Sequence, residues 1–283
     1  MIQFSRLEPV TRVTPLGVRF WDVTCNLPIE DGLIVSAYPL GQPQRFKRSL
    51  LNPSGIHLLQ NLDGLRDLES GAGDKTYWDD LNPDKKRDFV LEVEDTLGRF
   101  LPFACRIQAP IHGLMRLQDV LPLEPGNAIA LDPAQLGLGA DAMLLPLFSS
   151  PARRISNGMT AIRASLRENI HKPAAWASLE VNLGNAPPIL ARGFADANGQ
   201  LLILMPYPTL PNLTKPPPLG QQSWTLGIQA RYTPIKTIAS LNARALPDLY
   251  HLYQQKPSGS SSPLTLEFGH ELNLHLPEIA PAI

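Results

Sequence analysis

A histidine and a glutamate stand side by side at His270 and Glu271, the pair that opens the metal-binding motif of many zinc proteases. That chemistry needs a second histidine four residues after the first, on the same face of a helix. Here Leu274 holds that position, His275 comes one residue too late, and the segment alternates like a strand. We therefore expect no zinc site: His270 fits a core or interface position and His275 a solvent-facing one.

Two glycine-containing segments resemble functional loops but lack the surroundings that such loops need. Residues 137–142 match a loose dinucleotide-binding pattern, which needs a strand before it and a helix after it. Here Pro133 precedes the pattern and Pro146 follows four residues later, which leaves no room for a helix. Residues 196–199 begin like a calcium loop, lack its later ligands, and fit a hairpin turn better. The chain contains neither GxSxG nor GxxxxGK[ST]. We predict no catalytic, cofactor-binding or metal-binding residue, and no enzyme activity.

The aromatic pair Tyr77 and Trp78 is the first candidate contact site. It lies in a Gly- and Asp-rich segment that also holds Asp74, Asp79 and Asp80. Such a cluster could grip a sugar or a cation, or form a solvated loop. Aromatic side chains among polar residues are typical anchors of protein interfaces. Tyr77 and Trp78 are therefore predicted protein contacts.

Residues 264–276 have the strongest strand pattern and supply the second candidate contact site. Their apolar residues recur at every second position, which is typical of a strand with one buried face. A straight strand of this length is unusual, so we place a bend at Gly269. The strand either closes the chain's own core or adds to a neighbouring subunit's sheet. Its predicted contact residues are Leu264, Leu266, Phe268, Leu272 and Leu274.

These candidate sites must be positioned by strands and turns, which dominate the rest of the chain. Residues 89–93 and 100–107 read as strands joined by a turn at 95–98; Gly98 and Pro102 argue against a helix there. Residues flanking the 196–199 turn predict a hairpin. Residues 246–255 carry the best helix pattern.

The two halves of the chain repeat one faint plan at an offset of about 144 residues. Each half reads as strand, Pro-containing polar loop, strand, Gly-containing turn and strand. We predict a mainly β fold with two β-sandwich domains of the transthyretin-like or Ig-like kind. The predicted divisions are an N-terminal domain at 1–110, an ordered connector at 111–157, and a C-terminal domain with one short helix at 158–283.

The amino-acid composition limits the classes of partner and the cellular location that we expect. The 283 residues include 29 prolines, which fit short strands and ordered loops, and the net charge is −1. That balance gives no electrostatic footprint for nucleic acid. Neither a secretory signal nor a run of about 18 apolar residues is visible. We expect a cytoplasmic protein without an integral membrane segment, with peripheral membrane association left open. Cys25 and Cys105 are predicted to be reduced thiols, although a disulfide stays open.

A series of short segments, taken in order, resembles a component of contractile injection systems, the phage-tail-like particles of bacteria. These segments are residues 31–35, 64–69, 98–103, 173–177, 193–199, 206–208 and 266–269. Residues 18–69 and 160–207 also resemble the carboxypeptidase-regulatory, or transthyretin-like, β-sandwich. The resemblance implies a non-enzymatic structural subunit at or around the baseplate. Its implied partners are other subunits of the particle, namely baseplate, sheath or tube neighbours, or a second copy of the chain.

A carbohydrate-binding or adhesion-type β-sandwich module is the alternative function. It would need exposed rows of aromatic side chains and normally an export signal. Trp21, Trp176 and Trp224 fall on predicted strands, where packing in a core is the expected role. The structural subunit is therefore the leading hypothesis.

Overall fold

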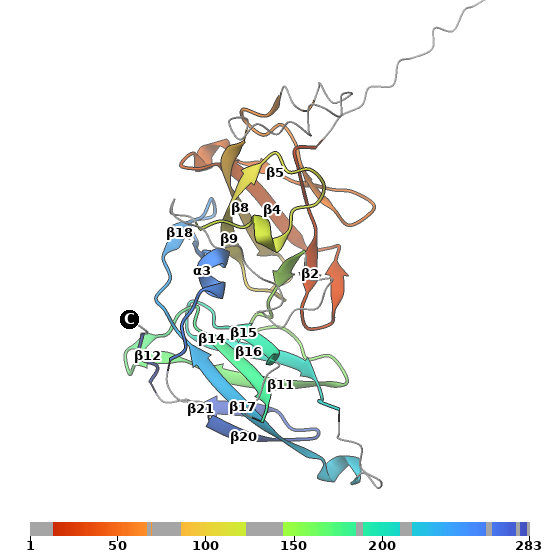
Figure 1. The fold of residues 1–283 in the computed structure, drawn as a ribbon, viewed down its shortest axis with the longest axis vertical. Helices are drawn as coiled ribbons and strands as arrows, with labels where there is room; N and C mark the ends of the chain where they lie inside the picture. The colour runs from red at the N-terminus through yellow and green to blue at the C-terminus, as the bar shows by residue number, and fades with distance from the viewer. Residues whose placement is uncertain are drawn as a thin grey trace, which may run out of the picture.

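The computed structural model describes residues 14–66, 69, 86–122, 144–184, 189–209, 217–258, 262–275 and 278–281. Within these ranges the chain is mainly β, which confirms that part of the predicted fold class. Figure 1 shows two β-rich bodies stacked along the long axis. We call the described residues 14–153 the N-terminal body, residues 232–258 the arm, and the other described residues from 159 onward the C-terminal body.

The described N-terminal body contains three sheets with mostly antiparallel neighbours. The first has the order β1 (Leu16–Val18), β7 (His57–Leu59), β6 (Leu50–Leu51). The second has the order β10 (Leu145–Leu147), β2 (Phe20–Asp22), β3 (Leu27–Ile29), with β10 parallel to β2. The third has the order β5 (Lys47–Arg48), β4 (Leu33–Pro39), β8 (Arg87–Asp95), β9 (Phe103–Ala109). Short 3₁₀ helices lie at η1 (Pro43–Arg45) and η3 (Leu117–Asp119).

The β8–β9 hairpin forms as the sequence predicts. Arg87 pairs with Ala109 and Val93 with Phe103, and Gly98 takes a positive φ of 67° in the connecting turn. Side chains from both faces of β8 are buried, so this strand is covered on each side. One cover is the core of the N-terminal body and the other is the arm.

Residues of the expected connector contribute to the N-terminal core. Met115, Leu117, Leu145 and Phe148 are buried with the side chains of β1, β8 and β9. The domain limits themselves stay a prediction. What the packing adds is that the chain returns through β10 to β2 before it enters the C-terminal body.

The C-terminal body has two main sheets around a common core. One has the order β16 (Gln200–Pro206), β11 (Met159–Ser165), β21 (Leu272–His275), with β21 parallel to β11. The other has the antiparallel order β15 (Ile189–Phe194), β14 (Ser178–Leu183), β17 (Ser223–Arg231), β20 (Ser262–Glu267). The hairpin β12 (Arg167–Asn169) and β13 (Lys172–Pro173) and the 3₁₀ helix η5 (Leu219–Gln221) lie outside them. Ile162 and Ile203 from the first sheet and Leu179 and Leu226 from the second share the core.

Two predicted segments of this body form the turn or bend that the sequence predicts, but their strands join different sheets. The turn at 196–199 forms, but β15 and β16 share only the bridge between Ala195 and Leu201. Beyond it β15 pairs with β14, and β16 pairs with β11. Likewise, the strand predicted at 264–276 is divided between β20 and β21, with the chain bending at Gly269, whose φ is 82°. Leu276 lies outside the described residues. Each strand pair therefore links the two sheets instead of extending one of them.

The arm crosses from the C-terminal body onto the N-terminal body. It contains the hairpin β18 (Thr237–Ala239) and β19 (Ala245–Pro247) and the helix α3 (Leu249–Tyr253), which is shorter than the predicted 246–255. Figure 1 shows β18 and α3 beside β9, above the sheet that holds β17. Leu249 and Leu252 join the N-terminal core. The arm thus fastens the two bodies to each other.

Candidate functional site

The predicted contact residues divide into two groups. Tyr77 and Trp78, with the neighbouring aspartates, lie outside the described residues. The C-terminal set lies in the chain's own C-terminal core: Leu266 and Leu274 are buried, and Leu264, Phe268 and Leu272 pack partly buried against it. In this structure the strand closes its own core, so Leu266 and Leu274 are not available as surface contacts.

The described motifs weighed for metal chemistry do not form a metal site, and His270 is exposed, so the core position expected for it is wrong. Glu271 forms an ion pair with Arg163 at 3.1 Å. Asp196 accepts hydrogen bonds from the backbone N–H groups of Asn198 and Gln200, which stabilises the turn. Residues 137–142 lie outside the described ranges. Among the described residues, no three His, Cys, Asp or Glu side chains gather as a metal site would require.

The described tryptophans do not form an exposed aromatic row. Trp176 and Trp224 are buried, as the sequence predicts. Trp176 lies in a turn with a positive φ of 64° and not on a strand. Trp21 is half-buried and donates through Nε1 to Asn26.

Cys105, Asp248 and His251 superficially resemble a catalytic set. Asp248 is fully buried, its Oδ2 lies 2.7 Å from His251 Nδ1, and its Oδ1 accepts from the Tyr250 N–H at the start of α3. A nucleophilic cysteine needs a lowered pKa. Burial instead raises the pKa of Cys105 well above its ordinary value, and the Asp248 charge raises it further. Asp248 therefore caps the helix, and the thiol is not activated.

A buried ion pair joins β2 to the residues that follow β10. Arg153 donates to both carboxylate oxygens of Asp22, at 3.0 and 2.5 Å. It also donates to Ser149 Oγ at 3.0 Å, and its guanidinium lies 4.8 Å from the centre of the Phe100 ring. The Arg153 and Asp22 side chains are 9% and 4% exposed. We call this one-to-one arrangement the Asp22 cluster.

A second buried cluster lies on the sheet face that the arm covers. Strand register places Arg192 of β15 directly opposite Glu180 of β14, where the two form an ion pair. Arg231, the last residue of β17, brings its Nε to 2.9 Å from Glu180 Oε2. Arg231 also donates through Nη1 to the backbone carbonyl of Gln255 in the arm. This Glu180 cluster holds two cations and one anion.

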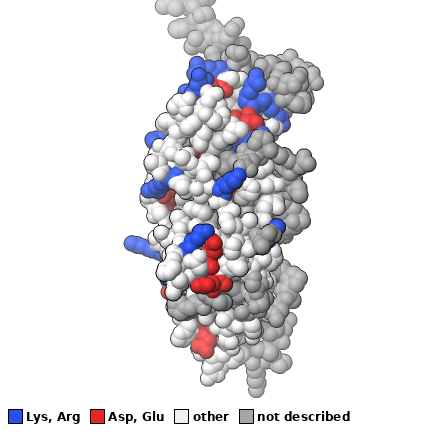
Figure 2. Space-filling model, turned by 90° about the vertical axis from the view of Figure 1, so that its left-hand side faces the viewer, with Lys and Arg blue, Asp and Glu red and all other residues white. Residues whose placement is uncertain are grey.

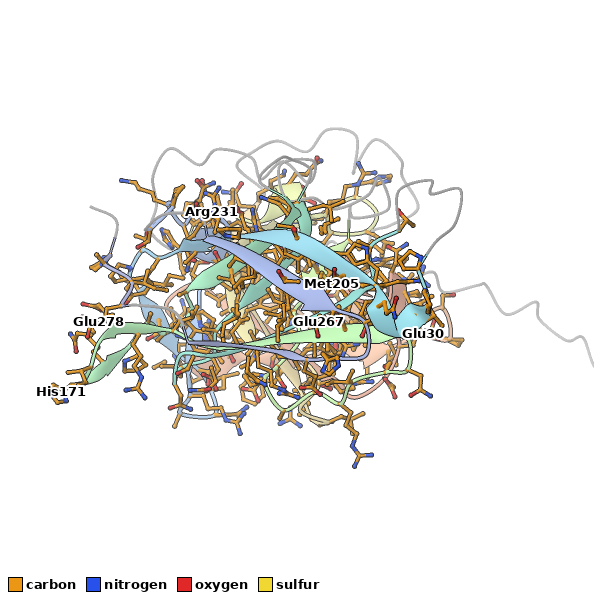
Figure 3. The ribbon with its side chains drawn as sticks, turned by 90° about the horizontal axis from the view of Figure 1, so that it is seen from below. Glu30, His171, Met205, Arg231, Glu267 and Glu278 are labelled. Carbon is orange, nitrogen blue, oxygen red and sulfur yellow. The ribbon has the colours of Figure 1, made fainter. Side chains whose placement is uncertain are left out.

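A cavity of about 80 Å³ opens beside the Glu180 cluster, between the two bodies. Its lining comes from β15, β16, the arm and the N-terminal body, and includes Arg192, Met205, Tyr253 and Phe148. Figure 3 views the C-terminal body from below and labels Met205 on β16 and Arg231 at the end of β17. β15 and β16 are the edge strands of their sheets, so the cavity lies where the two sheets part.

An exposed apolar edge lies on the N-terminal body. β6 pairs with β7 on one side, and its Leu50 and Leu51 are 63% and 47% exposed. Phe46, four residues earlier, is 41% exposed. Lys47 and Arg48 lie between them and make no ion pair with the described residues. On the face in Figure 2, Lys and Arg side chains gather at the N-terminal-body end.

Comparisons with known proteins find little. No protein-family model and no curated protein matches the chain. The Bacillus anthracis TIE protein aligns over 95% of this chain and 34% of its own, at 7% identity and a TM-score of 0.25. A 9R-lipoxygenase from Cyanothece PCC8801 aligns over 43% of this chain and 17% of its own, at 11% identity and a TM-score of 0.20. The chain thus spans about a third of the first protein's length. Similarity at these scores indicates neither a shared family nor a shared function.

Within the described ranges, no helix is long and apolar enough to cross a membrane. Cys25 and Cys105 are free thiols.

Sequence reasoning did not single out Glu180, Arg192 or Tyr253. The available signal was a charged residue in the middle of each of two short strands, where both neighbours along the chain are apolar or small.

Proposed function

We propose that the chain is a non-enzymatic structural subunit of a contractile injection system, at or around its baseplate. The resemblance of its sequence segments supports the type of particle. The exposed apolar edge at Phe46, Leu50 and Leu51 is the observation that carries a role in assembly. Its partner is a neighbouring subunit of the particle.

The edge at β6 differs from the edge at β20. An open edge offers unpaired backbone groups, and proteins usually protect it with proline or charge. β20 carries Pro263 and Glu267 on its exposed positions. β6 exposes two leucines instead, which favours burial against another protein.

Charge around this edge indicates the chemistry of the partner surface. Arg45 is exposed and lies 3.9 Å from Asp63, while Lys47 and Arg48 have no described ion pair. A partner that presents apolar side chains with Asp or Glu beside them would bury the leucines and neutralise these cations. We therefore assign an acidic, apolar strand edge of a neighbouring subunit as the occupant.

The packing of the arm supports a role in transmitting movement between subunits. The arm carries buried residues into the N-terminal core while its ends remain in the C-terminal body. Two bodies joined in this way move together, because separating them would expose Leu249 and Leu252 to water. A subunit that transmits movement in a contractile particle needs such a joint.

The proposal is tested in a bacterium that encodes the chain together with such a particle. The tagged chain should purify with sheath and tube proteins at a fixed ratio, and deletion of its gene should leave particles with an altered baseplate by electron microscopy. Intact particles after deletion, together with absence of the chain from purified particles, would overturn the proposal.

A paired set of variants tests the edge. Leu50→Glu with Leu51→Glu should leave the chain folded but absent from particles. Leu97→Glu is the matched control, since Leu97 is 60% exposed on the same body but lies in a turn. Equal incorporation of both variants would rule out the β6 edge as the contact.

A further inference from the structure

The Glu180 cluster has one more positive than negative charge in a largely buried place. The side chains of Glu180, Arg192 and Arg231 are 4%, 9% and 30% exposed. A buried charge is costly unless another charge or hydrogen bonds compensate it. The described residues provide no second carboxylate in an ion pair with either arginine. The cluster is therefore suited to one additional anion.

Two hydrogen-bond donors beside the cluster have no partner among the described residues. They are Arg192 Nε and the Tyr253 hydroxyl, and both atoms are buried. Burial raises the pKa of Tyr253, so its hydroxyl keeps its proton and acts as a donor. A buried donor without an acceptor destabilises the fold, because it has lost its hydrogen bonds to water. Both residues line the same cavity, so one acceptor there could serve both.

The size and walls of the cavity limit what that acceptor can be. At 10–15 Å³ for each water position, about 80 Å³ holds roughly half a dozen waters. That space accommodates an ion of a few heavy atoms and excludes a nucleotide or a sugar. Phe148, Ile203 and Met205 provide apolar walls, while Thr24 and Ser149 add hydroxyl groups. A small ion with a charged end and an apolar end matches this lining.

We propose that this cavity binds a small carboxylate of acetate size, with the carboxylate accepting from Arg192 Nε and the Tyr253 hydroxyl and the alkyl end facing Phe148 and Met205. The carboxylate balances the extra positive charge of the Glu180 cluster. It contacts both bodies and the arm, so its binding stabilises their arrangement. This inference does not depend on the proposed particle.

The experiment titrates the full-length protein with sodium acetate and, separately, with sodium chloride at equal ionic strength. Isothermal titration calorimetry and thermal unfolding report binding, and saturation-transfer NMR on the acetate methyl group reports contact with the protein. Acetate is expected to bind and to raise the unfolding temperature, whereas chloride has a smaller effect. Equal effects of the two salts would overturn the proposal.

Three variants locate the site. Tyr253→Phe keeps the ring and removes the donor, and is expected to weaken acetate binding about tenfold. Arg192→Lys keeps a cation opposite Glu180 but removes Nε, and should also weaken it. Tyr232→Phe is the matched control, because Tyr232 is a buried tyrosine whose hydroxyl bonds to Glu168 away from the cavity. Unchanged affinity in Tyr253→Phe, or an equal loss in Tyr232→Phe, would contradict the assignment.

The last experiment tests whether the site is specific for small carboxylates. Acetate and propionate should compete for the site, and neutral acetamide should not bind. A bulky carboxylate such as benzoate should be excluded by the size of the cavity. Tight binding of benzoate with none of acetate would overturn the proposal.

Discussion

The Asp22 and Glu180 clusters are both buried ion-pair sites, but the positive and negative charges balance only in the Asp22 cluster. Asp22 meets a single guanidinium, and Arg153 donates to both of its oxygens and to Ser149. Glu180 meets two guanidinium groups, and Arg192 Nε has no hydrogen-bond partner among the described residues. The first cluster closes on itself and fixes the chain after β10 against β2. The second leaves positive charge and donors facing a cavity, which is the arrangement of a binding site.

The largest expected effect comes from breaking the complete cluster. Arg153→Met leaves the Asp22 carboxylate buried without a cation, so the free energy of unfolding should fall by about 3–5 kcal/mol. Urea denaturation measures this loss. Arg244→Met is the control, because Arg244 is 68% exposed and 3.9 Å from Glu94, and should change stability by under about 0.5 kcal/mol. Similar losses in both variants would show that the buried Asp22 cluster stabilises the fold no more than an exposed ion pair does.

A third buried carboxyl sharpens the comparison, because Glu92 has no cationic partner in the described part of the chain. It accepts from the Tyr38 hydroxyl at 2.9 Å, and burial raises its pKa above the ordinary 4.5. The folded state therefore holds a proton that the unfolded state releases, and stability falls as pH rises from 4.5 through the raised pKa.

Glu92→Gln should remove this pH dependence while keeping an acceptor for Tyr38. We expect the variant to gain stability relative to the parent protein as pH rises from 4.5 to 8. Urea denaturation at several pH values measures the difference. Parallel stability curves for the two proteins would mean that Glu92 titrates normally.

Removing the surplus cation should have a smaller effect on stability. Arg231→Met leaves Glu180 paired with Arg192, and Arg231 is partly exposed, so we expect a loss below about 1 kcal/mol. The same change balances the charge of the cluster and should weaken acetate binding. A loss as large as that of Arg153→Met would show that all three charges form one inseparable unit.

The smallest effect on stability is expected at the β6 edge. Leu50→Glu with Leu51→Glu should change the free energy of unfolding by no more than about 0.5 kcal/mol, because both side chains are largely exposed. Chemical denaturation of the isolated chain measures this. A large loss would mean that the leucines stabilise the fold, and failed assembly could then not be attributed to a lost contact.

The sequence was sufficient for local structure. Alternation of apolar residues predicted the β8–β9 hairpin, and glycine's freedom to adopt a positive φ predicted the turn after β8 and the bend at Gly269. These features depend on neighbouring residues only. The mainly β fold class followed from the same patterns.

Tertiary structure determined which sheet each strand joined. The turn at 196–199 was predictable, but alternation alone does not say that β15 joins β14 while β16 joins β11. The candidate site depends on that choice: register sets Arg192 opposite Glu180, and the arm then brings Tyr253 from a distant part of the chain to the same cavity. Pairing between strands far apart in sequence follows from how whole sheets bury their faces, so no local pattern contains it.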